Sequence, residues 1–284
     1  MQKLSLLLLL PSSFASISWQ EWKQKHSMSF SHREDAYRET IFRNNHVKVL
    51  NHNKRFSKGL ETFTMDLTKF AHLTEKEFLD QYTIKKDPVL DWYTQYTCTE
   101  NYNGGVSASE VDWRSQNNPK NKVLVTAVKD QGNCGSCWTF GATGTLEGQA
   151  CQSDEHDCTT WPGLSEQHIL DCASFNETFL GEYNDYGCIG GGEQSNALRW
   201  LWMNGGVSSE ELYPYKAKDG TCQNPTNVFN TQDKCGTTSF DGANAELLQS
   251  AVYNIGPVTV GIDVERSLQL YSGGIYSARD CTLQ

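Results

Sequence analysis

The sequence predicts an α+β fold, with a helical leader ahead of a domain whose helices come first and whose strands come later. Three observations carry this prediction. The stretch 34–53 contains neither Gly nor Pro, and 137–150 also favours a helix. The segment 257–263 reads PVTVGID and predicts a strand. Helices that precede strands along the chain are typical of an α+β arrangement.

The first 18 residues have the form of a secretory signal peptide. Lys3 is followed by an apolar run over 4–10 and then by small residues, which predicts cleavage after Ser18. This run is too short to cross a bilayer as a helix, and no later stretch is long enough, so no membrane span is predicted. The ten cysteines are therefore expected to meet an oxidising compartment. The expected destination is a lysosome or acidic vacuole, or the extracellular space.

The overall composition is that of a globular, acidic protein. The chain has 284 residues, enough for one large domain or two modest ones. Its formal net charge is −10, which argues against nucleic acid as a partner, because nucleic-acid binding needs a basic surface. The same charge argues weakly against anionic membranes. The simplest explanation of the acidity is solubility.

Residues 19–82 have a charged, helical composition. Six residues within 34–53 follow one another at steps of 4, 3, 4, 4 and 4, which keeps them on one stripe of an α-helix. These residues are Glu34, Arg38, Phe42, Asn45, Val49 and Asn53. A stripe that mixes charges, amides and one aromatic ring predicts a helix that crosses a second helix with polar contacts. The spacing alone leaves a plain amphipathic helix as an equal alternative.

A second, short helix is expected to start at Thr74, where the sequence reads TEKEF. Thr74 and Glu77 match a capping box, in which each side chain bonds the backbone N–H of the other. Helical periodicity is lost over 85–108, where the composition is that of a linker. The sequence therefore predicts a boundary near residue 105, with a helical leader before it.

The domain after this boundary contains three predicted helices. The first, 137–150, carries three glycines that permit a neighbour to approach closely, which indicates a buried helix. Ser165 is the expected N-cap of the second helix. The third helix is expected over 245–255.

The segment 129–141, KDQGNCGSCWTFG, places Cys134 and Cys137 three residues apart. A lone Cys-x-x-Cys is compatible with zinc binding, with dithiol exchange or with halves of two disulfides. A zinc site would need a second such pair or a His pair nearby, and the sequence has neither. A thioredoxin-like site usually has its Trp before the pair, whereas Trp138 follows it here.

The surroundings of Cys137 favour a catalytic thiolate. Cys137 begins the predicted helix, so the positive end of the helix dipole is expected to stabilise its ionised form. Gly132 and Gly135 permit the backbone to approach a substrate closely. Gln131 and the backbone N–H of Cys137 are placed to hold a developing oxyanion, as acyl transfer requires.

These residues resemble the papain and cathepsin cysteine peptidases, family C1. The family signature C-G-[SA]-C-[WY] stands here as CGSCW at 134–138. Other segments follow in the family order: VDWR at 111–114, LSEQHILDC at 164–172, GCIGG at 187–191, YPY at 213–215, GPVTVGID at 256–263 and SGGIY at 272–276. The six-residue stripe is similar to the ERFNIN pattern of the inhibitory propeptide. The resemblance runs from about residue 19 to the last residue.

The resemblance implies a papain-like two-lobe peptidase, with a helical left lobe and an incomplete β-barrel right lobe, preceded by an α-helical propeptide. The implied division is a signal peptide over 1–18, an inhibitory propeptide over 19–105 and a peptidase domain over 106–284. The implied activity is that of a cysteine endopeptidase zymogen, which acts through an acyl-enzyme and is inhibited by its own propeptide. Peptides and proteins are the expected substrates, no cofactor or metal is expected, and a monomer is expected.

The resemblance also implies roles for individual residues. Cys137 is the implied nucleophile and Gln131 the implied oxyanion-hole side chain. Gly135, Gly190 and Gly191 are expected to contact a substrate backbone. The implied disulfides are Cys134–Cys188 and Cys172–Cys222, with Cys151–Cys158 as a further expected pair around a short insertion.

The catalytic His and Asn of the family have no counterpart at the matching positions of this sequence. The seven histidines are His26, His32, His46, His52, His72, His156 and His168. The resemblance places the catalytic His a few residues after Cys281, whereas the sequence ends at Gln284. We therefore expect a truncated zymogen that is inactive as written. Cys98, Cys235 and Cys281 have no assigned partners.

Two departures from the family pattern concern specificity and acid activation. Gly192, Glu193 and Gln194 stand where the family often has apolar pocket residues, so the usual apolar preference is not carried over and Glu193 is compatible with a basic side chain. His72 stands where the propeptide of the family has an acid-sensing Asp. Since an imidazole titrates near pH 6.5, the trigger for release on acidification need not be the usual one.

Two other functions stay open at this point. One is a non-catalytic product whose leader inhibits related cysteine peptidases. The other is redox or zinc chemistry at Cys134 and Cys137, which requires both thiols to be free.

Overall fold

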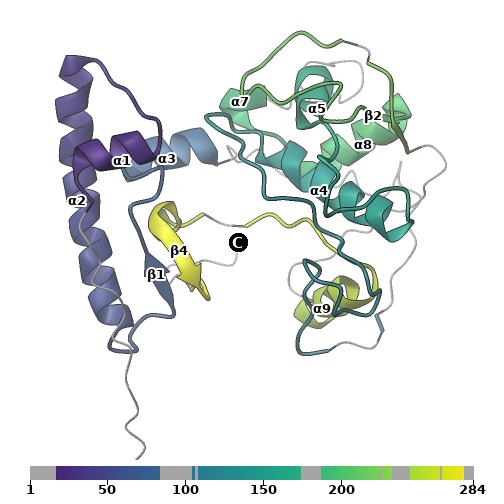
Figure 1. Cartoon of the computed structure of the whole chain (residues 1–284), viewed down its shortest axis with the longest axis horizontal. Helices are drawn as coiled ribbons and strands as arrows, with labels where there is room; N and C mark the ends of the chain where they lie inside the picture. Colours follow the sequence, from purple (N-terminus) through teal and green to yellow (C-terminus); the bar gives the residue numbers. More distant parts are fainter. Residues whose placement is uncertain are drawn as a thin grey trace, which may run out of the picture. The chain divides into compact units, whose positions relative to one another are not determined.

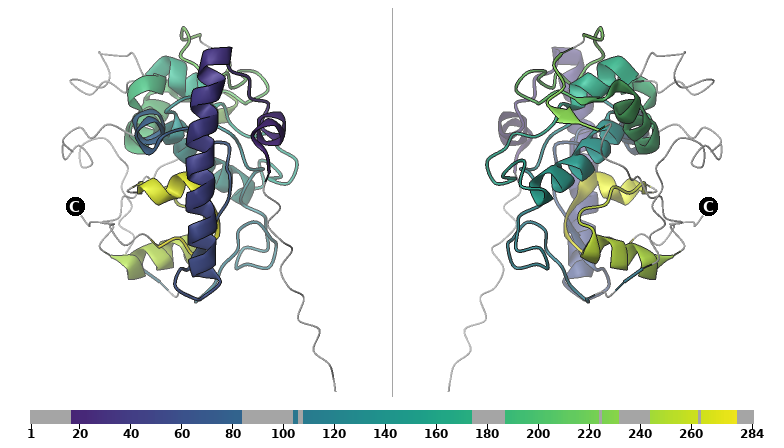
Figure 2. Two further views of the ribbon diagram at one scale, coloured as in Figure 1. Left: turned by 90° about the vertical axis from the view of Figure 1, so that its left-hand side faces the viewer. Right: turned by 90° about the vertical axis from the view of Figure 1, so that its right-hand side faces the viewer.

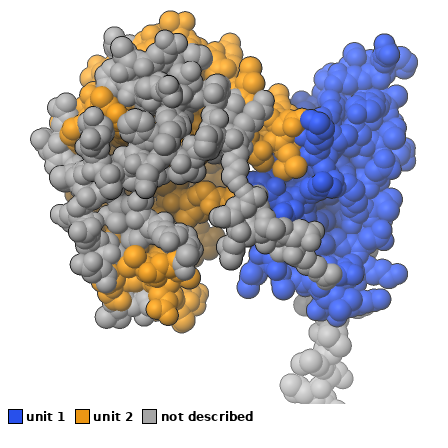
Figure 3. Space-filling model, turned by 180° about the vertical axis from the view of Figure 1, so that it is seen from behind, with its two compact units in different colours: residues 1–78, 264–284 blue, residues 79–263 orange. Residues whose placement is uncertain are grey.

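The computed structural model describes residues 17–83, 104–105, 108–173, 187–223, 225–231, 244–262 and 264–277. Its contacts divide the chain into two units, one of residues 1–78 with 264–284 and one of residues 79–263 (Figure 3). Several predictions fall outside the described residues: most of the signal peptide, most of the linker, and Cys98, Cys235 and Cys281.

The first unit is built on three leader helices (Figure 1). These are α1 (Trp19–Lys25), α2 (His32–Phe56) and the start of α3 (Glu75–Tyr82). The helix predicted over 34–53 is confirmed, and it extends to 25 residues because Ser31 caps its first turn by accepting from the N–H of Glu34. The expected capping box is also confirmed, since Glu77 N–H donates to Thr74 Oγ1 and Thr74 N–H donates to the Glu77 carboxylate.

Aromatic side chains join α1 to α2, which lie side by side in both views (Figures 1 and 2). The ring of Trp19 lies 5.3 Å from that of Phe42, and the ring of Trp22 lies 5.5 Å from it. Trp22 is fully buried, and its indole N–H donates to the carbonyls of Leu67 and Thr68. A helix of seven residues is only marginally stable by itself. The burial of the two indoles is therefore the main stabilisation of α1.

The polar members of the α2 stripe explain its mixed character. Asn45 donates two 3.0 Å hydrogen bonds to the carbonyls of Ala71 and Leu73. Asn53 donates to the Met65 carbonyl at 2.8 Å and accepts from its N–H at 2.9 Å. The predicted polar contact with a second helix is made by Arg38, which reaches Glu77 on α3. The two amides instead bind backbone that lies outside any helix.

The leader also contributes a strand that the sequence did not predict. β1 (Phe63–Met65) pairs antiparallel with β4 (Tyr271–Gly274), which follows the 3₁₀ helix η1 (Arg266–Leu270). Three residues are too few to show a period of two, and the partner is about 200 residues away, so no local pattern could reveal this sheet.

The longest described helix of the second unit is α4 (Cys137–Gln152), which is labelled in Figure 1. The others are α5 (Glu166–Ala173), α7 (Gly187–Gly190), α8 (Gln194–Asn204) and α9 (Ala245–Asn254), with β2 (Gly206–Val207) paired to β3 (Phe229–Asn230). The three predicted helices are confirmed. Ser165 is the N-cap of α5, since its Oγ accepts from the N–H of His168 at 3.0 Å.

The sequence predicted that neighbours approach α4 closely at its three glycines, and the structure shows this at two of them. A Cβ at Gly141 would lie 2.4 Å from Thr259 Oγ1, and one at Gly148 would lie 3.1 Å from the Leu124 carbonyl oxygen. Gly144 has open space around it. Close packing along α4 therefore depends on Gly141 and Gly148.

The predicted strand over 257–263 is wrong for its described residues 257–262, which are irregular. The alternation of Val258, Val260 and Ile262 supplies β propensity only, and a strand also needs a partner that accepts its backbone hydrogen bonds. No described strand pairs with this segment. Among the described residues, no helix is long and apolar enough to cross a membrane.

Candidate active site

The first residue of α4 is Cys137, and Ser136 precedes it as the N-cap. Cys137 is the one free cysteine among the described residues, and its side chain is half-buried. Its neighbour Cys134 is bonded to Cys188. Redox or zinc chemistry at Cys134 and Cys137 is therefore excluded, because it requires both thiols to be free.

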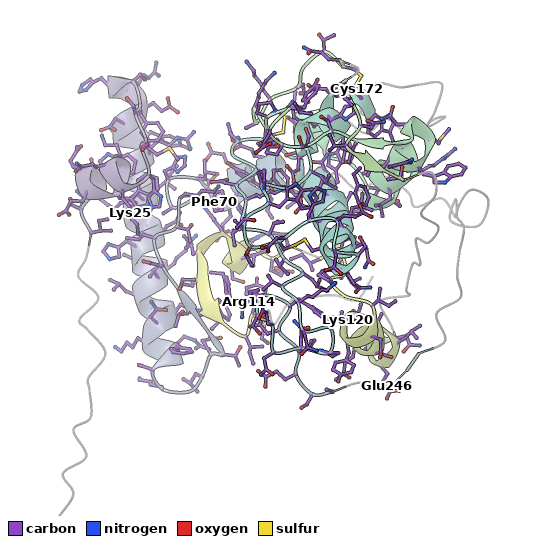
Figure 4. All side chains as sticks on the ribbon, turned by 45° about the vertical axis from the view of Figure 1, so that its right-hand side comes forward. Lys25, Phe70, Arg114, Lys120, Cys172 and Glu246 are labelled. Atoms are coloured by element: carbon purple, nitrogen blue, oxygen red, sulfur yellow. A yellow bond between two sulfur atoms is a disulfide. The ribbon has the colours of Figure 1, made fainter. Side chains whose placement is uncertain are left out.

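Among the described residues of the second unit, three disulfides are formed. They are Cys134–Cys188, Cys151–Cys158 and Cys172–Cys222, the last of which shows as a yellow bond at the labelled Cys172 in Figure 4. The first connects the loop before α4 to α7, and the third connects α5 to residue 222. The loop that carries the candidate site is thus held at both ends of its signature, covalently by the disulfide at Cys134 and non-covalently by the helix that begins at Cys137.

The electrostatics of Cys137 differ from the sequence expectation. Burial raises the pKa of the Cys137 thiol, and the nearby Glu193 carboxylate raises it further. The backbone N–H groups of Cys137 and Trp138 lower the pKa, as a helix N-terminus should, but they do not outweigh burial. A cationic partner is required to make this sulfur a thiolate at neutral pH.

Gln131 lies in the loop that precedes α4. Its Nε2 donates a 2.7 Å hydrogen bond to the Cys134 carbonyl. Since a primary amide has two hydrogens, this contact fixes the side chain and leaves one hydrogen for a ligand. Gly132 has φ of 62°, in the left-handed region that favours glycine.

Gly135 has a structural role that its position alone did not reveal. Its N–H donates to the Cys188 carbonyl at 2.8 Å, and a Cβ here would lie only 2.8 Å from the same oxygen. Any side chain would therefore push the signature loop away from α7. Gly190 ends α7, and the buried Gly191 follows with φ of 76°.

A tyrosine that sequence reasoning left without a role fixes this loop from the side. The hydroxyl of Tyr215 donates to the Gln131 carbonyl at 2.8 Å and shares a 2.5 Å hydrogen bond with Ser136 Oγ. Tyr215 appeared only as part of YPY, and no spacing relates it to residues some 80 positions earlier.

A buried ion cluster lies just before the loop, at Lys129. Its Nζ is 2.6 Å from the Glu147 and Glu166 carboxylates, which are 2% and 1% exposed. Burial lowers the pKa of Lys129, but the two carboxylates outweigh it and the net direction is upward. Burial also raises the pKa of Glu166, which Lys129 only partly offsets. No local pattern predicts this cluster, because its members come from three separate segments.

The two histidines of the second unit have other neighbours. His156 stacks on Trp161 with 3.8 Å between ring centroids. His168 is buried, its Nδ1 accepts from the Ser208 N–H, and burial lowers its pKa to about 4. The described residues therefore bring the free Cys137 and the Gln131 loop together, and neither of these two imidazoles is recorded in contact with Cys137.

The last turn of α3 contacts the same loop. Tyr82 donates from its hydroxyl to Asn133 Oδ1 at 3.1 Å. The carbonyl oxygen of Gln81 lies 3.6 Å from the Cβ position of Gly135. The end of the leader helix thus lies against the segment that holds Gln131 and Cys137.

Comparison with known proteins divides the chain in a similar way. Residues 107–284 match the family described as papain family cysteine protease, and residues 19–78 match the cathepsin propeptide inhibitor domain, I29. Cathepsin L1 of Drosophila melanogaster is 34% identical over an alignment of 293 positions, which covers 96% of this chain and 71% of that protein. Digestive cysteine proteinase 3 of Homarus americanus is 34% identical, and the match covers 94% of this chain and 77% of that protein.

Solved structures give the same result. A digestive procathepsin L 3 from the larval midgut of Tenebrio molitor superposes with a TM-score of 0.72 at 31% identity, covering 93% of this chain and 78% of that one. A recombinant stem bromelain precursor superposes with a TM-score of 0.66 at 27% identity, and the match covers 91% of this chain and 75% of that one. Both similarities extend over the leader as well as the later residues.

Proposed function

The chain belongs to the papain family of cysteine proteases and carries a cathepsin propeptide inhibitor domain, and from this premise we propose that Cys137 is its nucleophile and Gln131 its oxyanion-hole side chain. The fold is papain-like, and the protein is a cysteine peptidase zymogen. The observation that carries the proposal is the position of Cys137: a free sulfur on the first residue of a buried helix, beside the Gln131 loop.

The proposed chemistry is acyl transfer. The Cys137 sulfur forms a bond to the substrate carbonyl carbon, and the carbonyl electron pair moves to oxygen. The Cys137 N–H and the uncommitted hydrogen of Gln131 Nε2 stabilise that oxyanion. The C–N bond then breaks, the amine leaves with a proton, and water hydrolyses the thioester. Papain-family chemistry assigns the proton transfers to an imidazole, which also lowers the raised pKa of the thiol.

The proposed division is a signal peptide over 1–18, a propeptide over 19–105 and a peptidase domain over 106–284. The contacts of Tyr82 and Gln81 with the loop at 133–135 support autoinhibition by the leader. We propose Gly135, Gly190 and Gly191 as contacts to the substrate backbone. Glu193, which lies close enough to affect the Cys137 thiol, supports a preference for a basic substrate side chain.

The proposed localisation is the secretory pathway, ending in an acidic vacuole or outside the cell, and the proposed state is a monomer. The three disulfides support an oxidising compartment, because such bonds persist there and are rare in the cytosol.

A second candidate function is inhibition of related peptidases by the leader. The observation that favours it is that most of the buried residues of the first unit's core come from the leader, among them Trp19, Trp22, Phe42 and Val49, with Leu270 as the member from the C-terminal segment. A leader that supplies most of its own core can present the same surface to another peptidase of the family.

A thiol-alkylating peptidyl epoxide tests the first function. The full chain is incubated with the epoxide, and the modified residue is mapped by mass spectrometry. We expect labelling at Cys137, and we expect C137S to lose it. The control variant W202F keeps Cys137 and changes only an exposed side chain, so its labelling should be unchanged. Failure to label, together with inhibition of a related peptidase by the same chain, would replace the first function by the second.

A further inference from the structure

We propose that Tyr215 is a positioning residue of the oxyanion hole, which ties the Gln131 loop to the start of α4. The inference rests on the proposed function of Cys137 and Gln131. It assigns Tyr215 no contact with the reacting atoms. Its hydroxyl is instead the link between the two segments that supply the oxyanion donors.

The hydrogen-bond geometry defines the link. Tyr215 Oη lies 2.8 Å from the Gln131 carbonyl, to which it donates, and 2.5 Å from Ser136 Oγ. A phenol has one hydrogen, so while Tyr215 donates to Gln131 the serine must donate to Tyr215. The resulting chain of donors runs in one direction, from Ser136 through Tyr215 to Gln131.

The two ends of this chain adjoin the two oxyanion donors. Gln131 carries the amide donor on its own side chain. Ser136 precedes Cys137, whose N–H is the other donor. The side chain of Ser136 is fully buried, so its hydroxyl has no solvent to exchange with. Displacing Tyr215 Oη would therefore change the spacing of the two donors, while the sulfur stays on its helix.

Tyr215 is itself held in place by two contacts. Its backbone N–H donates to Glu210 Oε1 at 2.8 Å, and its ring meets Phe140 of α4 edge-on, with 4.9 Å between centroids. Burial raises the pKa of Tyr215 to about 12. The hydroxyl therefore keeps its hydrogen throughout the pH range in which a peptidase works.

Two reactions of Cys137 separate a positioning role from a general structural role. Iodoacetamide alkylates the sulfur by forming a C–S bond as the C–I bond breaks, and no charge develops on an oxygen. N-acetylglycinal adds reversibly: a C–S bond forms, the carbonyl pair moves to oxygen, and that oxygen takes up the thiol proton. Only the second reaction places the oxygen of a tetrahedral carbon next to the two donors, which then hydrogen-bond it in the adduct.

The experiment uses the full chain and four variants: Y215F, Y213F, Q131A and the double variant Y215F/Q131A. Y213F is the matched control, since the Tyr213 hydroxyl is also a buried donor, to Asp171 Oδ2 at 2.8 Å and to the Thr221 carbonyl at 3.4 Å, and neither acceptor belongs to the Gln131 loop. Iodoacetamide rate constants at Cys137 are measured by mass spectrometry. The affinity for N-acetylglycinal is measured by its protection of Cys137 against iodoacetamide.

We expect Y215F to weaken the aldehyde adduct about 3- to 10-fold, the value of one hydrogen bond, with the iodoacetamide rate constant unchanged within about 2-fold. Y213F should change neither quantity. In the Q131A background, Y215F should add little further loss, because two residues that act through one contact are not additive.

Equal loss in both reactions, no loss in either, or full additivity with Q131A would each overturn the inference. If Y215F does not fold, S136A breaks the same link with a small buried change and should weaken the adduct about 2- to 3-fold, and an unchanged affinity there would overturn the inference too. If the wild-type protein forms no adduct at Cys137, the proposed function fails first and the inference with it.

Discussion

The imidazole of His72 packs against the indole of Trp22, with 5.3 Å between ring centroids. The ring of Phe30 also packs against the imidazole of His72, with 5.4 Å between ring centroids. Burial and, to a smaller extent, Arg38 together lower the pKa of His72 to about 4, against opposing effects of the Lys69 backbone, Glu77 and Glu34. The packed leader therefore disfavours the protonated form of His72.

The first prediction is that acid destabilises the leader through His72. Its pKa is near 6.5 in the unfolded chain and about 4 in the folded one. As the pH falls from 6.5 to 4, only the unfolded state takes up the proton, so the free energy of unfolding falls. Allowing for the partial exposure of His72, the loss should be about 1–2 kcal/mol.

Urea denaturation at pH 7 and pH 5 checks this prediction, with the wild type compared to H72Q. H72Q should lose less stability than the wild type between the two pH values. H32Q, at the exposed start of α2, is the matched control. An H72Q profile with the same pH dependence as the wild type would assign acid sensitivity to other groups.

The second prediction concerns the buried amide of α2. N45A leaves the Ala71 and Leu73 carbonyls without their donor in a site that is 3% exposed. The free energy of unfolding should fall by about 2–3 kcal/mol, the penalty for unpaired buried polar groups. Chemical denaturation measures it. N51A, exposed on the same helix, should stay within about 0.5 kcal/mol, and equal effects of the two variants would contradict the prediction.

The third prediction concerns the ion cluster at Lys129. K129M leaves Glu147 and Glu166 buried without their cation, which should cost about 3–5 kcal/mol. Adding E147Q to K129M removes one of the uncompensated charges and should recover part of that loss. Thermal or urea unfolding measures both. K218M, at an exposed lysine, is the control, and a neutral K129M would show that the cluster does not stabilise the fold.

The fourth prediction concerns the reactivity of Cys137. Since Glu193 contributes to the raised pKa of the thiol, E193Q should lower that pKa and raise the rate of iodoacetamide alkylation at neutral pH. The pH dependence of the alkylation rate, which follows the thiolate fraction, should move towards lower pH. E211Q, an exposed change of the same kind, should leave the profile in place. A profile that E193Q does not move would mean that burial alone raises the pKa.

Some of the fold could be predicted because its causes are local. The period of α2, the capping box of Thr74 and Glu77, and the cap at Ser165 each involve residues within one or two helical turns. The signature around Cys137 lies in a single segment for the same reason. Its roles were then implied by resemblance, since spacing alone left zinc, redox and disulfide readings open.

Other features were missed or mispredicted because their causes are distant. β1 depends on β4, and 257–262 remains irregular because β propensity without a described partner strand makes no ladder. The direction of the Cys137 pKa was mispredicted from the helix dipole alone. Burial, which only packing decides, is the larger effect.

The sequence by itself determined the helices, their caps and the chemical identity of the candidate nucleophile, since these follow from residues close together in the chain. The tertiary structure decided how that nucleophile is surrounded: Tyr215 across from Gln131, the carboxylates around Lys129, and Glu193 near the sulfur. These contacts join segments tens of residues apart. Their energies depend on burial and distance, and neither quantity exists until the chain has folded.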